Sequence, residues 1–361
     1  MDATILRLDP AKAANFRYGF MLTSAQPGGA LSTDVTVRAL TVDGARLPAG
    51  ATTAQVPAES GGGIKLGSRW RVDQVRLSNV GYFKVWLKDV DNVSVTATRF
   101  EETTGVASDK DNIGGGNVRG ALISNNYFGP SARGNAIDLV RGSGVQIVAN
   151  TVQATPAQPH NIYLEGVTDA VISANTLTAS SISVQSNAGY ADQTAVVNPA
   201  NVLVQGNSVT GSASQGISVR YDAPRAGQAA TAASGAVGGG NRVLGNTVTG
   251  AQVAGIIDFA AADGLVGQPD EVSGNTVVDP FARGSATWNC GYGITQAAGI
   301  VVAAGQDTLT ESNTVKSSSA PGTVRYGLQV GVSSARGVHA SAVGSSTTVV
   351  VGVPQAVYRA S

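Results

Sequence analysis

The chain has 361 residues, and its 24 Lys and Arg balance its 24 Asp and Glu, so the formal net charge is zero. The sequence contains neither a basic stripe that would bind nucleic acid nor an apolar run of about 18 residues that would cross a membrane as a helix. The 46 glycines and the 5% aromatic content favour a thin core of small side chains, and the single cysteine, Cys290, excludes an intrachain disulfide.

Four stretches of the chain align residue by residue without a gap: 83–100, 111–128, 135–152 and 160–177. The last of them reads HNIYLEGVTDAVISANTL. Each stretch contains a first strand with alternating residues, a turn and a second strand. Shorter versions of the first strand recur later in the chain, at 181–185, 216–220, 255–259 and 299–302. Repeats of this kind predict a solenoid, in which consecutive coils stack on one another.

One asparagine recurs at the same place in seven consecutive units: Asn126, Asn150, Asn175, Asn207, Asn246, Asn275 and Asn313. The separations run from 24 residues (Asn126 to Asn150) to 39 residues (Asn207 to Asn246). A fixed pattern with variable inserts predicts stacked coils that carry loops. An Asn at one turn of every coil can hydrogen-bond both the next Asn and the turn backbone. We therefore expect an asparagine ladder in a parallel β-helix.

Alternation along the first strands assigns their side chains to two faces. The residues expected to point inward are Ile113, Ile137, Leu139, Ile162, Leu164, Ile182, Val184, Ile217 and Val219. One outward column is expected to contain Trp86, Gly114, Asp138, Tyr163, Ser183, Ser218 and Asp258. The next outward column is expected to contain Lys88, Gly116, Val140, Glu165, Gln185 and Arg220.

This outward face is interpreted as a carbohydrate-binding groove, with an ordinary solvated surface as the alternative. A solvated face would carry Ser, Thr, Lys and Glu in no order, whereas this one combines aromatic side chains with both signs of charge. The bare backbone from Gly114 to Gly116 would let a ligand approach closely. Inserts at 186–200 and 221–240 leave directly after two first strands, so their Tyr190 and Tyr221 are expected beside the groove.

The chain resembles the pectate-lyase-like superfamily of right-handed parallel β-helices over nearly its whole length. Besides the repeats, MDATILRLDP at 1–10 and DVTVRALTVDG at 34–44 resemble early coils of such proteins. The resemblance implies an all-β fold, a single solenoid domain over 1–361 with about ten coils. It also implies that the usual N-terminal cap and first coils are missing.

The superfamily mostly acts on polysaccharides, so the resemblance implies a lyase or epimerase acting on a uronate-containing glycan. Both reactions need a base at C5 and a group that neutralises the carboxylate. The candidates for proton transfer or charge neutralisation are Tyr163, His160, Lys88 and Arg220, and Gln185 or Asn161 could also hold the carboxylate. His160 is expected at the start of its strand, beside Asp111 and Asn135 of the preceding coils.

An inverting glycoside hydrolase is the alternative reaction, with Asp138 and Glu165 as the carboxyl pair. One strand spacing of ~4.8 Å and two residues of strand, ~6.7 Å, place them roughly 8 Å apart. That separation lies within the range of about 6.5–9.5 Å typical of inverting enzymes. The Asn-Thr-Asp, Gly-His-Gly and Arg-Ile-Lys signatures of polygalacturonases are absent, as is the Asp-Pro-His signature of alginate epimerases.

No cofactor is expected, although Asp109, Asp111 and Asp138 could together bind Ca²⁺. The expected partner is a polysaccharide or oligosaccharide, and neither nucleic acid nor a membrane is expected. A second class of function stays open, because tailspikes and adhesins use the same fold as a stiff rod, often trimeric. The predicted location is extracellular or virion-associated, and the sequence leaves monomer and trimer open.

Overall fold

A computed structural model provides the structure of the protein. It describes residues 4–9, 19–25, 31–44, 62–102, 111–130, 134–155, 161–187, 196–222, 237–261, 265–280, 298–303, 307–317, 324, 326–330, 341–343, 348–349 and 355–359. These residues form β-strands and turns, and none of them lies in a helix that is long and apolar enough to span a membrane. The chain divides into two compact units, Met1–Tyr163 and Leu164–Ser361.

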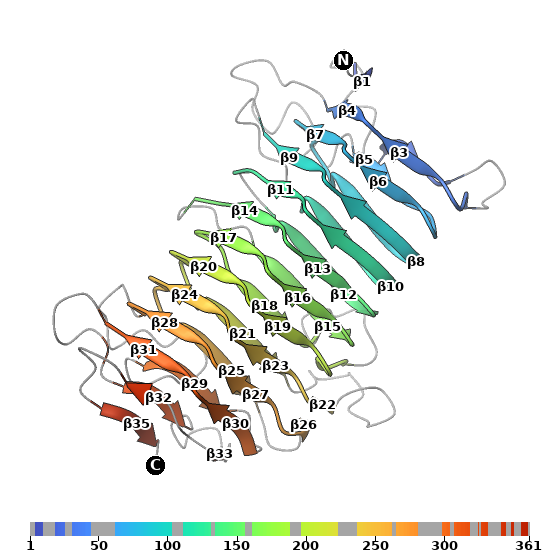
Figure 1. Cartoon of the computed structure of the whole chain (residues 1–361). Coiled ribbons are helices and arrows are strands. Elements are labelled where there is room, and N and C mark those ends of the chain that lie inside the picture. Colours follow the sequence, from blue (N-terminus) through green and yellow to red (C-terminus); the bar gives the residue numbers. More distant parts are fainter. Residues whose placement is uncertain are drawn as a thin grey trace. The chain divides into compact units, whose positions relative to one another are not determined.

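In the first unit, the chain passes repeatedly through three kinds of strand, and each pairs in parallel with its equivalent in the next coil (Figure 1). The first strands are β2 (Phe20–Thr23), β5 (Gly62–Lys65), the beginnings of β8 (Val85–Thr96) and β10 (Ile113–Ser124), and β12 (Ile137–Ser143). The second strands are β3 (Thr36–Arg38), β6 (Arg71–Asp73), the ends of β8 and β10, and β13 (Gln146–Val148). The third strands are β1 (Thr4–Arg7), β4 (Leu40–Asp43), β7 (Arg76–Ser78), β9 (Arg99–Glu101), β11 (Tyr127–Phe128) and β14 (Thr151–Gln153).

The second unit repeats this organisation, and β15 (Ile162–Thr168) begins two residues before it. Its further first strands are β18 (Ile182–Gln185), β21 (Ile217–Tyr221), β25 (Ile256–Ala260), β29 (Ala298–Ala303), β32 (Tyr326–Val330) and β35 (Gln355–Arg359). Its second strands are β16 (Val171–Ser173), β19 (Leu203–Gln205), β23 (Arg242–Leu244), β27 (Glu271–Ser273), β30 (Asp307–Glu311) and β33 (Ser341–Val343). Its third strands are β17 (Thr176–Thr178), β20 (Ser208–Thr210), β24 (Thr247–Thr249), β28 (Thr276–Val278), β31 (Thr314–Lys316) and β34 (Thr348–Val349). A short parallel pair, β22 (Gly238–Gly239) and β26 (Val266–Gln268), lies outside these sheets.

This repeated parallel pairing is the right-handed parallel β-helix that the repeats predicted. The predicted inward residues of the first strands are all buried, with exposures of 0–1%. Larger rings fill one layer of the first unit, where Phe100 and Phe128 stack with centroids 4.6 Å apart. Layers of Val, Ile and Leu otherwise fill the space between the sheets, because a thin solenoid core leaves room for few large rings.

The repeated asparagines are buried and hydrogen-bond from coil to coil. In the first unit, the Asn126 side chain donates to Oδ1 of Asn150 at 3.0 Å. In the second unit, the same bond runs through Asn175, Asn207, Asn246, Asn275 and Asn313 at 2.9–3.0 Å. The backbone amide of each donor asparagine also binds the next Oδ1, as in Asn207 to Asn246 at 2.9 Å. Each buried amide is therefore satisfied, which avoids a cost of about 1–3 kcal/mol per unpaired group.

A left-handed residue precedes each ladder asparagine and produces the sharp turn between second and third strands. Its φ is +55° at Asn125, +55° at Ala149 and +54° at Ala174, and glycine takes the same place at Gly206 and Gly274. Because non-glycine side chains rarely adopt this conformation, the tertiary hydrogen bonds of the ladder have to hold it.

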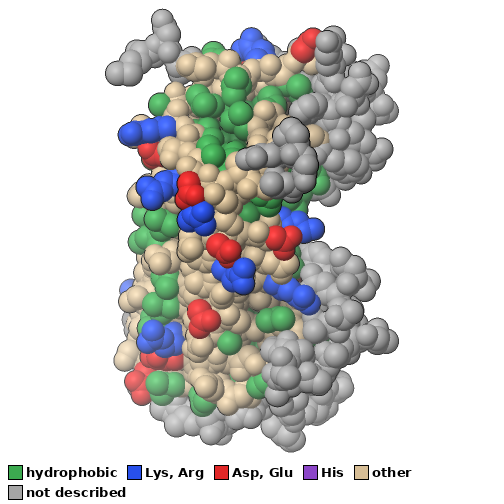
Figure 2. Space-filling view, turned by 90° about the vertical axis from the view of Figure 1, so that its right-hand side faces the viewer, with side chains coloured by type: hydrophobic (Ala, Val, Ile, Leu, Met, Phe, Trp, Pro, Cys, Tyr) green, Lys and Arg blue, Asp and Glu red, His purple; other side chains and the backbone are tan. Residues whose placement is uncertain are grey.

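The charged side chains of the surface are mixed in sign. On the face that Figure 2 shows, the described Lys and Arg side chains lie interspersed with Asp and Glu. Several of them form ion pairs between coils, such as Arg69 with Asp34 at 2.6 Å and Arg119 with Asp91 at 2.7 Å. Exposed pairs of this kind contribute about 0–1 kcal/mol each, so they matter less for stability than the buried layers.

Candidate functional site

The outward face of the first strands in the first unit has the register expected from the repeats. Gly114 pairs with Trp86 on one side and with Asp138 on the other, and Gly116 pairs with Lys88 and Val140. Trp86 and Asp138 are half-buried, whereas Lys88 is exposed. The structure therefore brings these predicted residues onto neighbouring strands.

The glycines of this face do not form the open floor that the sequence suggested. A Cβ at Gly114 would lie 2.4 Å from the Phe83 ring, so that ring already occupies the space above the glycine. Phe83 in turn packs against Trp86 at 4.2 Å and Tyr82 at 4.7 Å between centroids. The interpretation of Gly114 as a close-approach point for a ligand is wrong, because an aromatic cluster of this chain fills it. Gly116 remains partly exposed.

A hydrogen-bonded chain joins Asp111, Asn135 and Asp138 beside this aromatic cluster. Oδ1 of Asp111 accepts from the Asn135 backbone amide at 2.6 Å, and the Asn135 side chain donates to Oδ2 of Asp138 at 3.0 Å. The Asn161 carbonyl accepts from the amides of Ala136 and Ile137, so this residue anchors the start of β12. Among the described residues, no group of three or more His, Cys, Asp or Glu side chains could hold a metal ion. Asp109 lies outside the described residues, and the calcium site stays a prediction.

In the second unit, the outward face carries a polar row across β15, β18 and β21. Gln185 pairs with Arg220, and Ser183 pairs with Ser218, as the repeats predicted. Gln185 Nε2 donates to Glu165 Oε1 at 3.0 Å, and the Ser218 hydroxyl donates to that of Ser183 at 3.2 Å. Glu165 is only 4% exposed, so its carboxyl group lies in a partly desolvated setting.

Asp222 orients Arg220 at the end of this row. Arg220 Nε and one terminal nitrogen both lie 2.7 Å from Asp222 Oδ1, and Ser186 donates to Asp222 Oδ2 at 3.0 Å. The Arg220 side chain is 36% exposed, so the guanidinium is fixed in direction while it faces solvent. The sequence placed Asp222 only in the insert beside the groove, and it assigned neither Asp222 nor Ser186 a role in the site. The Arg-x-Asp spacing was the available signal, since residues i and i+2 of a strand share a face.

Asp258 does not lie in the outward column, and Tyr221 does not lie in a loop beside the groove, where the sequence had placed them. Tyr221 is fully buried, and Asp258, 1% exposed, pairs in register with the inward residue Val219. The residue opposite Ser218 is Ile257, which joins Phe259 and Val301 in a buried apolar cluster. The predicted column was therefore one residue out of register at β25, and this shift moves a side chain to the other face.

Inside the second unit, Tyr221 and Asp258 belong to a buried polar cluster that also contains Asp270, Asn241 and Thr308. The Tyr221 hydroxyl donates to Asp270 Oδ2 and accepts from the Asn241 side chain. Asp270 Oδ1 accepts from the Asn241 amide at 2.7 Å, and the Thr308 hydroxyl donates to Asp258 Oδ2 at 3.0 Å. Tyr221, which lies between Arg220 and Asp222 in the sequence, thus anchors the end of β21 in the core through these hydrogen bonds.

The two carboxyl groups of this cluster have raised pKa values. Burial, helped by the nearby charge of Asp270, holds the pKa of Asp258 well above its usual range. Burial raises the pKa of Asp270 to about 6, although hydrogen bonds from Tyr221 and the Asn241 amide act in the opposite direction. Burial and both carboxylates also raise the pKa of the Tyr221 phenol. The carboxyl pair therefore holds a proton at pH values where isolated aspartates are ionised.

The remaining predicted residues fall in three places. Tyr163 is half-buried on β15, two residues before Glu165 and so on the same strand face. His160 and Tyr190 lie outside the described residues. Asp138 and Glu165 belong to different units, so their separation stays a prediction from the repeat register.

The sequence matches no protein-family model and no curated protein. Solved structures share the fold at low identity. A variant of the catalytic domain of a GH87 alpha-1,3-glucanase in complex with nigerose superposes with a TM-score of 0.57 at 10% identity, over 98% of this chain and 58% of that one. The periplasmic alginate epimerase AlgG superposes with a TM-score of 0.50 at 12% identity, over 99% of this chain and 73% of that one. The chain thus spans little more than half of the glucanase domain, and the likeness establishes the parallel β-helix fold.

Proposed function

We propose that the protein is a polysaccharide-active enzyme, a lyase or epimerase that acts on a uronate-containing glycan along the outward face of its first strands. The observation that carries the proposal is the polar row Glu165–Gln185–Arg220–Asp222, built on consecutive strands. A rigid strand face with convergent charged and amide groups is the arrangement that orients a sugar chain. Neighbours in fold that act on glycans, a glucanase and an alginate epimerase, support the class of substrate.

Arg220 is the group proposed to neutralise the uronate carboxylate. Asp222 and Ser186 fix its position, so little side-chain freedom is lost when a carboxylate binds to its solvent-facing edge. An arginine can engage a carboxylate through two parallel hydrogen bonds, which acidifies the adjacent C5 proton by stabilising the developing enolate charge. Gln185, which pairs with Arg220 in register and donates to Glu165, would orient a sugar hydroxyl or the same carboxylate.

Proton transfer is assigned to Tyr163, with His160 as the other candidate. Tyr163 shares its strand face with Glu165, and a phenol can act as a general base or acid when a neighbouring cation favours its ionised form. In a lyase, the base removes the C5 proton and the glycosidic oxygen at C4 leaves with its electron pair. In an epimerase, the base likewise breaks the C5–H bond, a proton is then delivered to C5 from the opposite face, and the glycosidic bond stays intact. Because its substrates are polysaccharides, the enzyme is proposed to work outside the cytoplasm.

The test is a panel of uronate and neutral polysaccharides, with ultraviolet absorbance of 4,5-unsaturated uronates and new reducing ends measured in parallel. Absorbance that rises together with reducing ends supports a lyase. A change in uronate composition by NMR without new ends supports an epimerase. New reducing ends without absorbance contradict both and point to a hydrolase that uses Asp138 and Glu165. A structural rod of the tailspike type would give none of these signals.

Variants of the assigned residues sharpen this test. Arg220→Gln should reduce turnover by about a hundredfold, the usual loss for one preorganised charge-stabilising group. Tyr163→Phe should abolish elimination, and Asp138→Asn should leave it largely intact. The matched control is Arg242→Gln, since Arg242 is an exposed arginine on the second strand β23 and lies away from this row. Equal activity of Arg220→Gln and wild type would contradict the assignment.

A further inference from the structure

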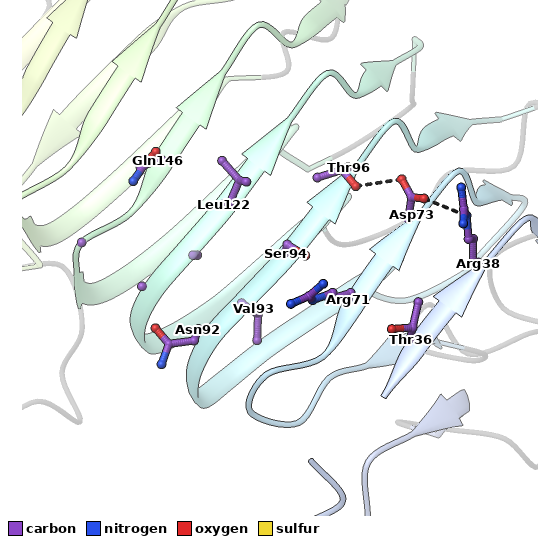
Figure 3. A pocket seen from close by; sticks show the side chains of 13 residues that line it. Thr36, Arg38, Arg71, Asp73, Asn92, Val93, Ser94, Thr96, Leu122 and Gln146 are labelled. Carbon is purple, nitrogen blue, oxygen red and sulfur yellow. Dashed lines mark hydrogen bonds and ion pairs between the residues drawn. The ribbon is translucent and has the colours of Figure 1, made fainter. Parts of the chain in front are cut away.

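A second surface of the first unit has the features of a binding site. A groove of about 660 Å³ lies over β3, β6, β13 and the second halves of β8 and β10 (Figure 3). Its size falls within the range of about 300–1,000 Å³ that is usual for ligand sites. It faces outward from the second strands, so none of the residues of the polar row belongs to it.

The floor of the groove is one column of outward side chains in continuous register. Thr36 pairs with Arg71, which pairs with Ser94, followed by Leu122 and Gln146. Five strands at a spacing of ~4.8 Å give a column roughly 19 Å long. A flat column of this length fits an extended oligosaccharide better than a compact metabolite.

Arg71 is the cation of this floor that is available to a ligand. Its neighbour Arg38 is paired with Asp73 at 3.0 Å, and Asp73 also accepts from Thr96 at 2.9 Å, as the dashed lines in Figure 3 show. Asp73 is thus engaged on both sides. Among the described residues, Arg71 makes no ion pair, and it lies exposed on the floor. An unpaired guanidinium in a groove is suited to a carboxylate or sulfate group.

The rest of the groove suits a sugar ring. Leu122 is 38% exposed, one of the few large apolar side chains on the described surface, and offers a platform for the apolar face of a pyranose. Ser94 and Gln146 on either side of it, and Thr36 beside Arg71, can exchange hydrogen bonds with hydroxyl groups. The wall is bare backbone at Gly120 and Gly144, whose φ values are +68° and +66°. A Cβ at Gly120 would lie 2.6 Å from Asn92 Oδ1, so a larger residue there would displace the Asn92 side chain.

We infer that this groove binds a segment of an acidic glycan, with the anionic group of one sugar on Arg71 and the ring of a nearby sugar on Leu122. The choice of a glycan rather than another anion rests on the proposed function. The binding itself does not, because the groove uses other strands and another face. The groove would hold the polymer while the first-strand face acts on it, which raises the local concentration of sugar units.

The test is calorimetric titration of the full chain with three oligosaccharides of equal length: an oligogalacturonate, a sulfated galactan oligomer and a neutral cello-oligosaccharide. All titrations use the Arg220→Gln background, which removes the proposed carboxylate-binding group of the first-strand face. The parent should bind at least one acidic oligomer, and Arg71→Gln should weaken this binding about tenfold, the effect of losing one charge-assisted contact. Arg242→Gln, a matched exposed arginine that faces Glu271 on a second strand of the other unit, should leave it unchanged.

A second variant separates charge from shape. Leu122→Ser should weaken binding of the acidic oligomer while its salt dependence stays the same, and Arg71→Gln should reduce that salt dependence. Equal binding by the parent and Arg71→Gln, equal binding of neutral and acidic oligomers, or no binding of either acidic oligomer would each overturn the inference. The preferred acidic oligomer identifies carboxylate or sulfate as the ligand group. Turnover is measured separately on the wild type. A protein that binds the acidic oligomer through Arg71 but turns over no polysaccharide would contradict the proposed function and leave the groove assignment intact.

Discussion

The two units bury ionisable groups in opposite ways. The first unit places a lysine against a glutamate, whereas the second places two aspartates and a tyrosine together. An ion pair inside the fold depends on the presence of both partners, whereas two like acids depend on a shared proton. The comparison shows that the same repeated architecture can respond in two ways. The stability of the first unit depends on keeping both residues of the ion pair, whereas the stability of the second depends on pH.

The ionic cluster of the first unit contains Lys84, Glu102 and Asn112. Lys84 is 0% exposed, and its ammonium lies 2.5 Å from Glu102 Oε1 and 2.8 Å from Asn112 Oδ1. Burial raises the pKa of Glu102, and the charge of Lys84 opposes this rise. The pair is maintained because each charge compensates the desolvation of the other.

The acidic cluster of the second unit has no cation among its described members. Asp258 is 1% exposed, and its Oδ1 accepts no hydrogen bond from a neutral donor in the described structure. The Asp258 and Asp270 carboxyl groups lie within hydrogen-bonding reach of each other, and such a bond requires that one of them holds a proton. Like charges this close cannot both ionise without a large cost.

The largest expected effect is the loss of Lys84. Lys84→Met should lower the free energy of unfolding by about 3–5 kcal/mol, because Glu102 stays buried without its counter-charge. Chemical denaturation measures this change. The double variant Lys84→Met, Glu102→Leu is the control and should recover most of the stability, since an apolar pair removes both charges. A double variant as unstable as the single one would show that packing, and not charge, causes the loss.

The second prediction concerns pH in the second unit. The folded pKa of Asp270, about 6, lies above the ordinary value of 3.8, so the folded state binds the proton more tightly than the unfolded chain. The stabilisation is complete below pH 3.8 and is lost as the pH rises through 6, which corresponds to about 3 kcal/mol for this group. The raised pKa of Asp258 extends the loss to higher pH.

Urea denaturation at a series of pH values on both sides of 6 measures how steeply the free energy of unfolding falls with pH. Asp258→Asn should flatten this slope, because an amide donates to Asp270 without a titrating proton and still accepts from Thr308. If wild type and Asp258→Asn have the same slope, the carboxyl pair does not share a proton.

A smaller effect is expected from Tyr221→Phe. Loss of the hydroxyl removes the donor to Asp270 Oδ2 and one acceptor of the Asn241 side chain, which still donates to the Pro199 carbonyl, and should cost about 1–3 kcal/mol. Tyr127→Phe is the matched control, since the Tyr127 hydroxyl donates to Gln153 at 2.8 Å on the surface and should cost well under half as much. Similar losses in both variants would show that the buried cluster contributes no more than a surface bond.

The smallest effect on stability is expected from Arg220→Gln. Its pair with Asp222 is partly exposed, so the free energy of unfolding should change by less than about 1 kcal/mol while turnover falls. Thermal denaturation and turnover are measured on the same sample. A large loss of stability would show that Arg220 is structural, and its effect on turnover would then carry no information about the site.

The repeats predicted the fold and much of the register because both depend on short-range periodicity. The ladder asparagines and the alternation of residues such as Ile182 and Val184 follow the same period in every coil. The register of Trp86, Gly114 and Asp138 could therefore be predicted without any tertiary information.

Three features could not be predicted, each for a physical reason. Asp258 lies in a strand whose five residues are all buried, so apolar–polar alternation cannot assign its face. Phe83, which precedes strand β8, covers Gly114 with its ring. A packing contact of that kind leaves no periodic signal in the sequence. Arg71 and its neighbours Thr36 and Gln146 in the groove lie on three-residue strands, which are too short to show a period.

The asparagine bonds also make the molecule modular. Neighbouring rungs are separated by 24 residues in one coil and 39 in another, yet the side-chain bond that joins them stays at 2.9–3.0 Å. The length of chain between rungs is therefore decoupled from the geometry of the scaffold. Evolution, or an engineer, can graft a longer or shorter specificity loop into one coil while the neighbouring coils keep their alignment.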